Sequence, residues 1–107
     1  MEKLTKINQF YKSCKDAINP KLLNLGYKIS QKKNHLKCEV WINYKEKHCY
    51  RFIWHEQDQC FSLEESDYIN DPEKVGWLDA VVVDYDGNIS NRSIWGEIIE
   101  EIKTEII

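Results

Sequence analysis

Residues 36–64, LKCEVWINYKEKHCYRFIWHEQDQCFSLE, alternate apolar and polar side chains through three runs that two short charged segments separate. Alternation with a period of two is typical of strands with one buried face, and short polar breaks are typical of hairpin turns. The stretch therefore predicts a three-stranded antiparallel meander. An odd-length connection around residues 45–47 would put one apolar set on the buried face: Cys38, Val40, Ile42, Tyr44, Tyr50, Phe52, Trp54, Phe61 and Leu63.

The opposite face of the predicted sheet is mostly polar, but it carries Trp41 and Ile53 beside Arg51. Trp and Arg are the residue types that dominate protein-binding hot spots. Two interpretations stay open for this face. Either it binds a partner, or another segment of the chain folds over it.

Amphipathic helices are predicted on both sides of the meander. In residues 3–18 the apolar side chains recur every three or four positions, which is the spacing of one helix face. The pair Asn19 and Pro20 predicts a break, followed by a short helical turn that ends at Gly26. An isoleucine-rich stripe from Ile94 onward predicts a C-terminal helix that starts near residues 90–93.

Two further strands complete the expected fold. Residues 27–30 predict a short edge strand, and residues 77–85, which contain AVVV, predict a central, well-buried strand. The whole chain, residues 1–107, is expected to form a single α+β domain with two layers. Its antiparallel meander sheet has four to five strands, and the N-terminal and C-terminal helices cover one face.

Charge divides the chain into two halves. Residues 1–55 hold twelve Lys and Arg against four Asp and Glu, whereas residues 56–107 hold three against fourteen. Many of these acids fall in residues 64–76, which predict a long loop because of Pro72 and Gly76. Such asymmetry indicates an interaction surface for a cationic partner. The candidate contact residues are Trp41, Arg51, Ile53, Glu64, Glu65, Asp67, Asp71, Asp84 and Asp86.

Catalytic and metal-binding patterns are weak in this sequence. The histidines and cysteines lack the paired spacing of a structural zinc site, and only His55 and Cys60 are expected to be cross-strand neighbours. Cys49 follows His48, but nothing suggests an oxyanion hole for a cysteine nucleophile. We expect reduced thiols, no cofactor, no metal and no enzymatic activity.

Membrane and nucleic-acid partners are not expected either. The longest apolar run, residues 80–83, is far shorter than the ~20 residues that span a bilayer. The N-terminus lacks the apolar segment of a secretory signal, so the expected compartment is the cytoplasm. The lysines of the first half cover a helix face without interleaved aromatic or arginine side chains, which favours solvated lysines over a nucleic-acid site.

The layout of the chain resembles that of small bacterial immunity proteins, which neutralise polymorphic or contact-dependent toxins. The resemblance rests on a leading helix that ends in LLNLGYKI, on VWINY, YRFIWH and CFSLEES in the meander, and on the acidic loop, the late strand and the terminal Ile/Glu helix that follow. It implies a cytoplasmic, non-enzymatic inhibitor that binds a toxin, often a basic nuclease domain, and blocks its active site. Two alternatives remain: a small-ligand or metal-binding domain, and an acidic nucleic-acid mimic from a mobile element.

Overall fold

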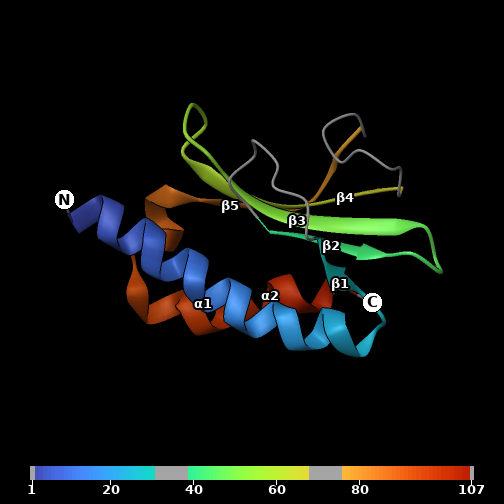
Figure 1. The fold of residues 1–107 in the computed structure, drawn as a ribbon. Helices are drawn as coiled ribbons and strands as arrows, with labels where there is room; N and C mark the ends of the chain where they lie inside the picture. The colour runs from blue at the N-terminus through green and yellow to red at the C-terminus, as the bar shows by residue number, and fades with distance from the viewer. Residues whose placement is uncertain (1, 31–38, 68–75, 107) are drawn as a thin grey trace.

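The computed structural model describes residues 2–30, 39–67 and 76–106, and it confirms the α+β fold with two layers. Two helices lie on one face of a five-stranded antiparallel sheet (Figure 1). In chain order the elements are α1 (Glu2–Asn24), β1 (Lys28–Ile29), β2 (Val40–Asn43), β3 (His48–His55), β4 (Cys60–Asp67), β5 (Leu78–Asp84) and α2 (Trp95–Thr104). Neighbours in the sheet follow the chain, in the order β1-β2-β3-β4-β5. Neither helix is long and apolar enough to cross a membrane.

The predicted faces of β3 and β4 are confirmed. Phe52 pairs with Leu63 and Trp54 with Phe61, and these side chains pack in the main core under the helices. Arg51 pairs with Glu64 and His55 with Cys60 on the other face. No helix covers that second face in the described part of the chain, and we call it the open face (Figure 1).

The predicted face of the first run is wrong. Asn43 pairs with His48, so the turn between β2 and β3 has four residues, Tyr44 to Lys47, rather than an odd number. Lys47 closes this turn in the left-handed region at φ 53°. The even length reverses the alternation, because one residue of shift moves every side chain to the other face.

Trp41 consequently points into the core and is 0% exposed. Its Nε1 donates a hydrogen bond to Asn19 Oδ1 on α1 at 2.8 Å. Tyr44, expected inside, is exposed in the turn, whereas Val40 and Ile42 lie on the open face. Cys38, the remaining member of the predicted set, lies outside the described residues.

Helix α1 is continuous, although the sequence predicted a break at Asn19 and Pro20. Proline removes the hydrogen bond to the carbonyl of Asp16, which lies on the exposed side of the helix. Ile18 and Leu22 are both buried on the core side, so packing on either side of Pro20 keeps the helix together.

Gly26 ends α1 as predicted. Its φ of 96° lies in the left-handed region that glycine tolerates best. Tyr27 N donates to Leu22 O at 3.0 Å and Gly26 N to Leu23 O at 3.1 Å, which is the hydrogen-bond pattern of a Schellman cap. The cap turns the chain directly into β1.

Strand β5 is an edge strand, not the central strand that AVVV predicted. A bulge falls where Leu63 pairs with Val81 but Glu64 pairs with Asp79, so that Ala80 is the extra residue. Ala80 and Val81 both pack against the core, and Asp79 is brought to the open face. The apolar composition of AVVV therefore predicts the wrong position for β5 in the sheet.

The acidic segment after the meander is partly strand. β4 continues through Asp67, so Glu64, Glu65 and Asp67 belong to the sheet and not to a loop. Asp71 lies outside the described residues. A 3-10 turn, Arg92–Ile94, capped by the side chain of Asn91, precedes α2, so the α-helix itself begins slightly later than expected. The predicted isoleucine stripe is buried at Ile98 and Ile102 in α2 and at Ile106 just beyond it.

Candidate functional site

The open face has an apolar end and a polar end. At the apolar end Val40, Ile42 and Cys49 form a small buried cluster against Trp77. The guanidinium of Arg51 lies over the Trp77 ring at 4.4 Å from its centroid, which is the geometry of a cation–π contact. Trp77 therefore links the apolar cluster to the charged residues beside it.

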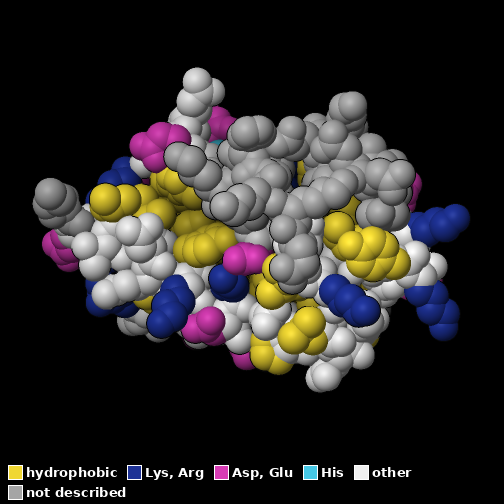
Figure 2. Space-filling view, in the orientation of Figure 1, with side chains coloured by type: hydrophobic (Ala, Val, Ile, Leu, Met, Phe, Trp, Pro, Cys, Tyr) yellow, Lys and Arg dark blue, Asp and Glu magenta, His cyan; other side chains and the backbone are white. Residues whose placement is uncertain are grey.

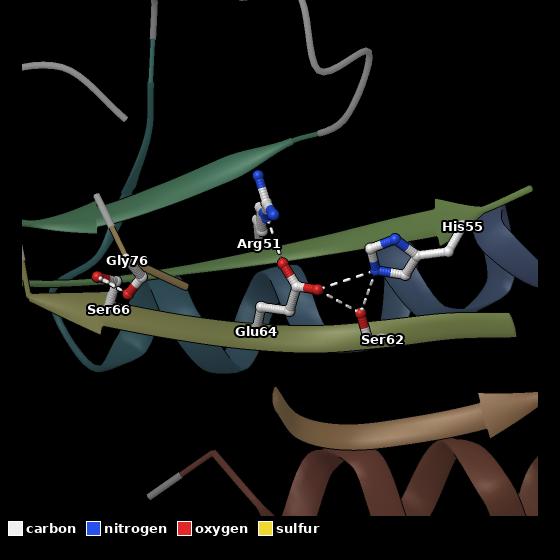
Figure 3. A network of polar contacts seen from close by, with 6 residues as sticks. All are labelled: Arg51, His55, Ser62, Glu64, Ser66 and Gly76. Carbon is white, nitrogen blue, oxygen red and sulfur yellow. Dashed lines mark hydrogen bonds and ion pairs between the residues drawn. The ribbon is translucent and has the colours of Figure 1, made fainter. Parts of the chain in front are cut away.

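A network of charged and polar side chains occupies the middle of this face (Figure 3). Arg51 Nε donates to Glu64 Oε1 at 2.5 Å. The second carboxylate oxygen, Oε2, lies 2.7 Å from Ser62 Oγ and 2.9 Å from His55 Nε2. The carboxylate is thus held from two neighbouring strands. Its side chain is only 6% exposed, so it depends on these partners in place of water.

The network keeps Glu64 ionised. Burial by itself would raise the pKa of this carboxyl. Hydrogen bonds from Ser62 and Arg51, the guanidinium charge and the contact with His55 outweigh burial, so the pKa lies below its ordinary value. Glu64 is therefore a buried carboxylate whose charge is compensated locally, and it offers little net charge to a partner.

Ser62, His55 and Glu64 do not have the arrangement of a catalytic triad. In a triad the hydroxyl and the carboxylate contact different nitrogens of the imidazole. Here Ser62 Oγ, at 2.8 Å, and Glu64 Oε2 both approach His55 Nε2. Ser62 also donates its own proton to Glu64 and is 1% exposed, so it is not poised as a nucleophile.

The described cysteines are free and buried, and burial makes them poor nucleophiles. Burial raises the pKa of Cys49 to about 11, with a smaller contribution from Asp67. Burial, followed by the charges of Asp58, Asp84 and Asp79, also raises the pKa of Cys60. Cys60 pairs with His55 as predicted, yet the described residues contain no group of three or more His, Cys, Asp or Glu that could hold a metal ion.

A shallow hollow of about 270 Å³ lies at the polar end of the open face. We call it the acidic hollow, and its described lining residues are His55, Asp58, Cys60, Ser62, Asp79, Val82 and Asp84. None of them is Lys or Arg, and none of the three aspartates forms an ion pair with a described residue. Val82 is 52% exposed at its edge. Asp86 follows two residues after Asp84 and is also exposed.

Charges of both signs lie at the end of the molecule that carries the acidic hollow. Figure 2 shows acidic side chains where the β3–β4 turn projects, Lys or Arg side chains at that same end of the molecule, and further Lys or Arg side chains at the opposite end, near the β2–β3 turn. These two hairpin turns read EQDQ and YKEK. The hollow is therefore acidic in its own lining, while Lys3 of α1 lies over the ring of Tyr85, the residue after Asp84.

A second polar group lies on the helix side of the sheet, beyond the end of α1. Tyr27 Oη and His48 Nδ1 are 2.7 Å apart, and His48 Nε2 lies 3.3 Å from Glu65 Oε1. Burial, with smaller contributions from Tyr50 and Glu65, raises the pKa of Tyr27 to about 12. The Tyr27 hydroxyl thus stays protonated near pH 7 and shares a hydrogen bond with the imidazole.

The predicted contact residues fall into three groups. Asp67, Asp84 and Asp86 are exposed and can meet a partner, and Ile53 is half-buried on the open face. Arg51, Glu64 and Glu65 lie in the structure but are already paired with neighbours. Trp41 is the clear correction, because it is buried against α1 and cannot serve as a surface anchor.

Sequence reasoning missed Asp58, Asp79 and Val82 as parts of the same surface. Asp58 could have been found, because the predicted β3–β4 turn places it near Cys60. Asp79 could not, because the bulge at Ala80 decides which face it takes. No protein family, curated protein or solved structure matches the chain, so the surface has to be interpreted from its own chemistry.

Proposed function

We propose that this protein is a non-enzymatic, immunity-type inhibitor that binds a cationic protein, such as a basic nuclease toxin, in the bacterial cytoplasm. The observation that carries the proposal is the acidic hollow, where Asp58, Asp79 and Asp84 lie together without a cation among the described residues. A nuclease that grips phosphates presents the opposite charge, so the two surfaces would attract.

Three features of the described residues support binding rather than catalysis. The His55 network lacks triad geometry, the thiols at Cys49 and Cys60 have raised pKa values, and Glu64 is locally compensated. An exposed apolar side chain, Val82, borders the charged residues, as is usual where a charged rim surrounds an apolar contact. Ile53 is half-buried on the same face.

The proposal can be tested by affinity capture with matched charge reversals. Asp58→Lys with Asp84→Lys changes the acidic hollow, and Glu97→Lys with Glu101→Lys makes the same change in net charge on the exposed side of α2. Each tagged variant and the unchanged protein would be incubated with extract of the native cell at low and high salt. Captured proteins would be identified by mass spectrometry and assayed for nuclease activity or growth arrest.

We expect a basic protein that the unchanged chain and the α2 variant capture and inhibit at low salt. The variant in the acidic hollow should capture about a tenth as much of it or less at low salt, because the charges that steer the encounter are reversed. Equal loss of binding in both variants would show that only net charge matters. Retention by the hollow variant would overturn the proposed site.

A further inference from the structure

The two edges of the sheet differ in a way that concerns binding. Strand β1 has two residues, whereas β5 has seven, and no described strand lies beyond β5. A free edge presents backbone N–H and C=O groups that can pair with a strand of another chain. A two-residue edge offers almost no such pairing, but β5 is long enough for it.

One hydrogen bond identifies which backbone groups of β5 face outward. Tyr85 N donates to Gln59 O at 2.9 Å, next to the pair formed by Cys60 and Asp84. Backbone groups alternate between the two sides of an antiparallel strand. Those of Val81 and Val83 therefore point to β4, and those of Val82 and Asp84 point away from the sheet.

The outward-facing residues also border the acidic hollow. The side chains of Val82 and Asp84 line it, and Asp79 joins them from the other side of the bulge. A strand added to this edge would place alternate side chains over the same face. It would meet aspartate near both ends of β5 and an exposed valine between them.

This charge pattern favours a cationic strand over a second copy of the chain. In a two-fold symmetric pairing, the two ends of one β5 would face the opposite ends of the other. Asp79 of one copy would then lie near Asp84 of its partner, and like charges in such positions are unfavourable. Lys or Arg in the added strand would instead pair with both aspartates.

We propose that β5 is a docking edge for an extended segment of the partner in which Lys or Arg alternates with an apolar residue. The inference rests on the proposed function, since it specifies how the cationic partner is held. Backbone hydrogen bonds at Val82 and Asp84 supply the pairing, and the aspartates select the basic strand.

The probe for this test is a capped peptide of about seven residues, the length of a typical strand, that alternates lysine and valine. It would be titrated into the protein at low salt and followed by calorimetry. Its control carries N-methyl groups on the amides of one edge, which removes backbone donors and keeps the charge. Because each lost hydrogen bond is worth about 1 kcal/mol, two losses should weaken binding by roughly tenfold or more.

Amide hydrogen exchange supplies an internal control. Saturating peptide should slow exchange at Val82 and Asp84 by about tenfold or more, because their amides become hydrogen-bonded. Exchange at Val81 and Val83 should change little, because β4 already protects those amides. Equal binding of the N-methylated peptide, no measurable binding, or unchanged exchange at Val82 and Asp84 would each overturn the docking edge.

Two variants separate this inference from the proposed function. Val82→Pro removes an outward N–H and leaves the bonds to β4 intact, so it should weaken peptide binding with little change in thermal unfolding. Asp79→Lys with Asp84→Lys tests attraction to the hollow. If charge reversal weakens binding but Val82→Pro and N-methylation do not, the cationic-partner proposal stands and strand pairing is wrong. If charge reversal has no effect, both are wrong.

Discussion

The two faces of the sheet are built from the same alternating sequence, but one is apolar and packed under the helices and the other carries charged side chains. The helix side is closed by large apolar side chains such as Trp41, Phe52 and Phe61, which are 0 to 1% exposed. The open face instead carries a compensated ion pair, Arg51 with Glu64, and next to it aspartates that form no ion pair with a described residue. The first face stabilises the fold, and the second holds charge in position.

The difference lies in how each face satisfies its side chains. On the helix side, burial removes apolar surface from water, which is worth roughly 25 cal/mol per Å². On the open face, burial of Glu64 is unfavourable unless Arg51, Ser62 and His55 all remain in place. Substitutions should therefore affect the two faces by different mechanisms and by different amounts.

The largest expected effect is the loss of Trp41. Trp41→Ala should lower the free energy of unfolding by about 3–5 kcal/mol, because it leaves a cavity under α1 and removes the hydrogen bond to Asn19. Urea unfolding followed by circular dichroism would measure this. Val82→Ala is the matched control on an exposed site and should change stability by less than about 0.5 kcal/mol. Similar, small effects of the two changes would mean that Trp41 is not a core residue.

Trp41 also shows what the sequence can and cannot determine. The faces of β3 and β4 were predictable, because Arg51 and His55 could not be placed in an apolar core. Residues 40–44 contain apolar side chains at both odd and even positions. Which of these side chains face the core therefore depends on whether the next turn has three or four residues. Composition of that turn, YKEK, does not determine its length.

Other misses have the same kind of cause. The sequence correctly predicts the apolar stripes of both helices, but it predicts a break at Pro20 because the buried contacts that hold the helix together there are not visible in sequence. It predicts a central strand at AVVV, whereas the position of that strand depends on the order of pairing in the sheet. The acidic character of the site was predictable, whereas the grouping of Asp79 with Asp58 required the bulge.

The next largest effect should follow from neutralising Glu64. Glu64→Gln leaves Arg51 buried without its countercharge, and breaking such a pair costs on the order of 3 kcal/mol. Because the pKa of this carboxyl is lower in the folded chain, its ionised form stabilises the fold above the ordinary value of 4.5. That contribution is lost as the pH falls below this value. Unfolding of the unchanged protein should therefore depend more steeply on acid pH than that of the variant.

A double variant makes the second prediction sharper. Arg51→Met with Glu64→Leu removes both charges, so it should recover most of the stability that Glu64→Gln loses. Recovery would show that the penalty comes from an unpaired charge. If the double variant is as unstable as Glu64→Gln, the loss comes from packing around Trp77 and not from electrostatics.

Substitutions in the acidic hollow should have the smallest effect on stability. The pKa of the Cys60 thiol, which lines the hollow, depends on the negative charges around it. Its pKa is raised first by burial and then by Asp58, Asp84 and Asp79. Asp58→Asn with Asp84→Asn should change the free energy of unfolding by less than about 0.5 kcal/mol, because both side chains are exposed. The same change should lower the pKa of Cys60 and increase its alkylation by iodoacetamide, a neutral reagent, at a fixed pH.

Mass spectrometry of the Cys60 peptide would measure this rate separately from the other thiols. The matched control is Glu97→Gln with Glu101→Gln on α2, which removes the same two negative charges from exposed positions and should leave the rate unchanged. If both pairs speed alkylation equally, the thiol senses net charge and not the hollow. If neither pair changes the alkylation rate, burial alone sets the reactivity of Cys60. The aspartates of the hollow would then not act together as one charged surface.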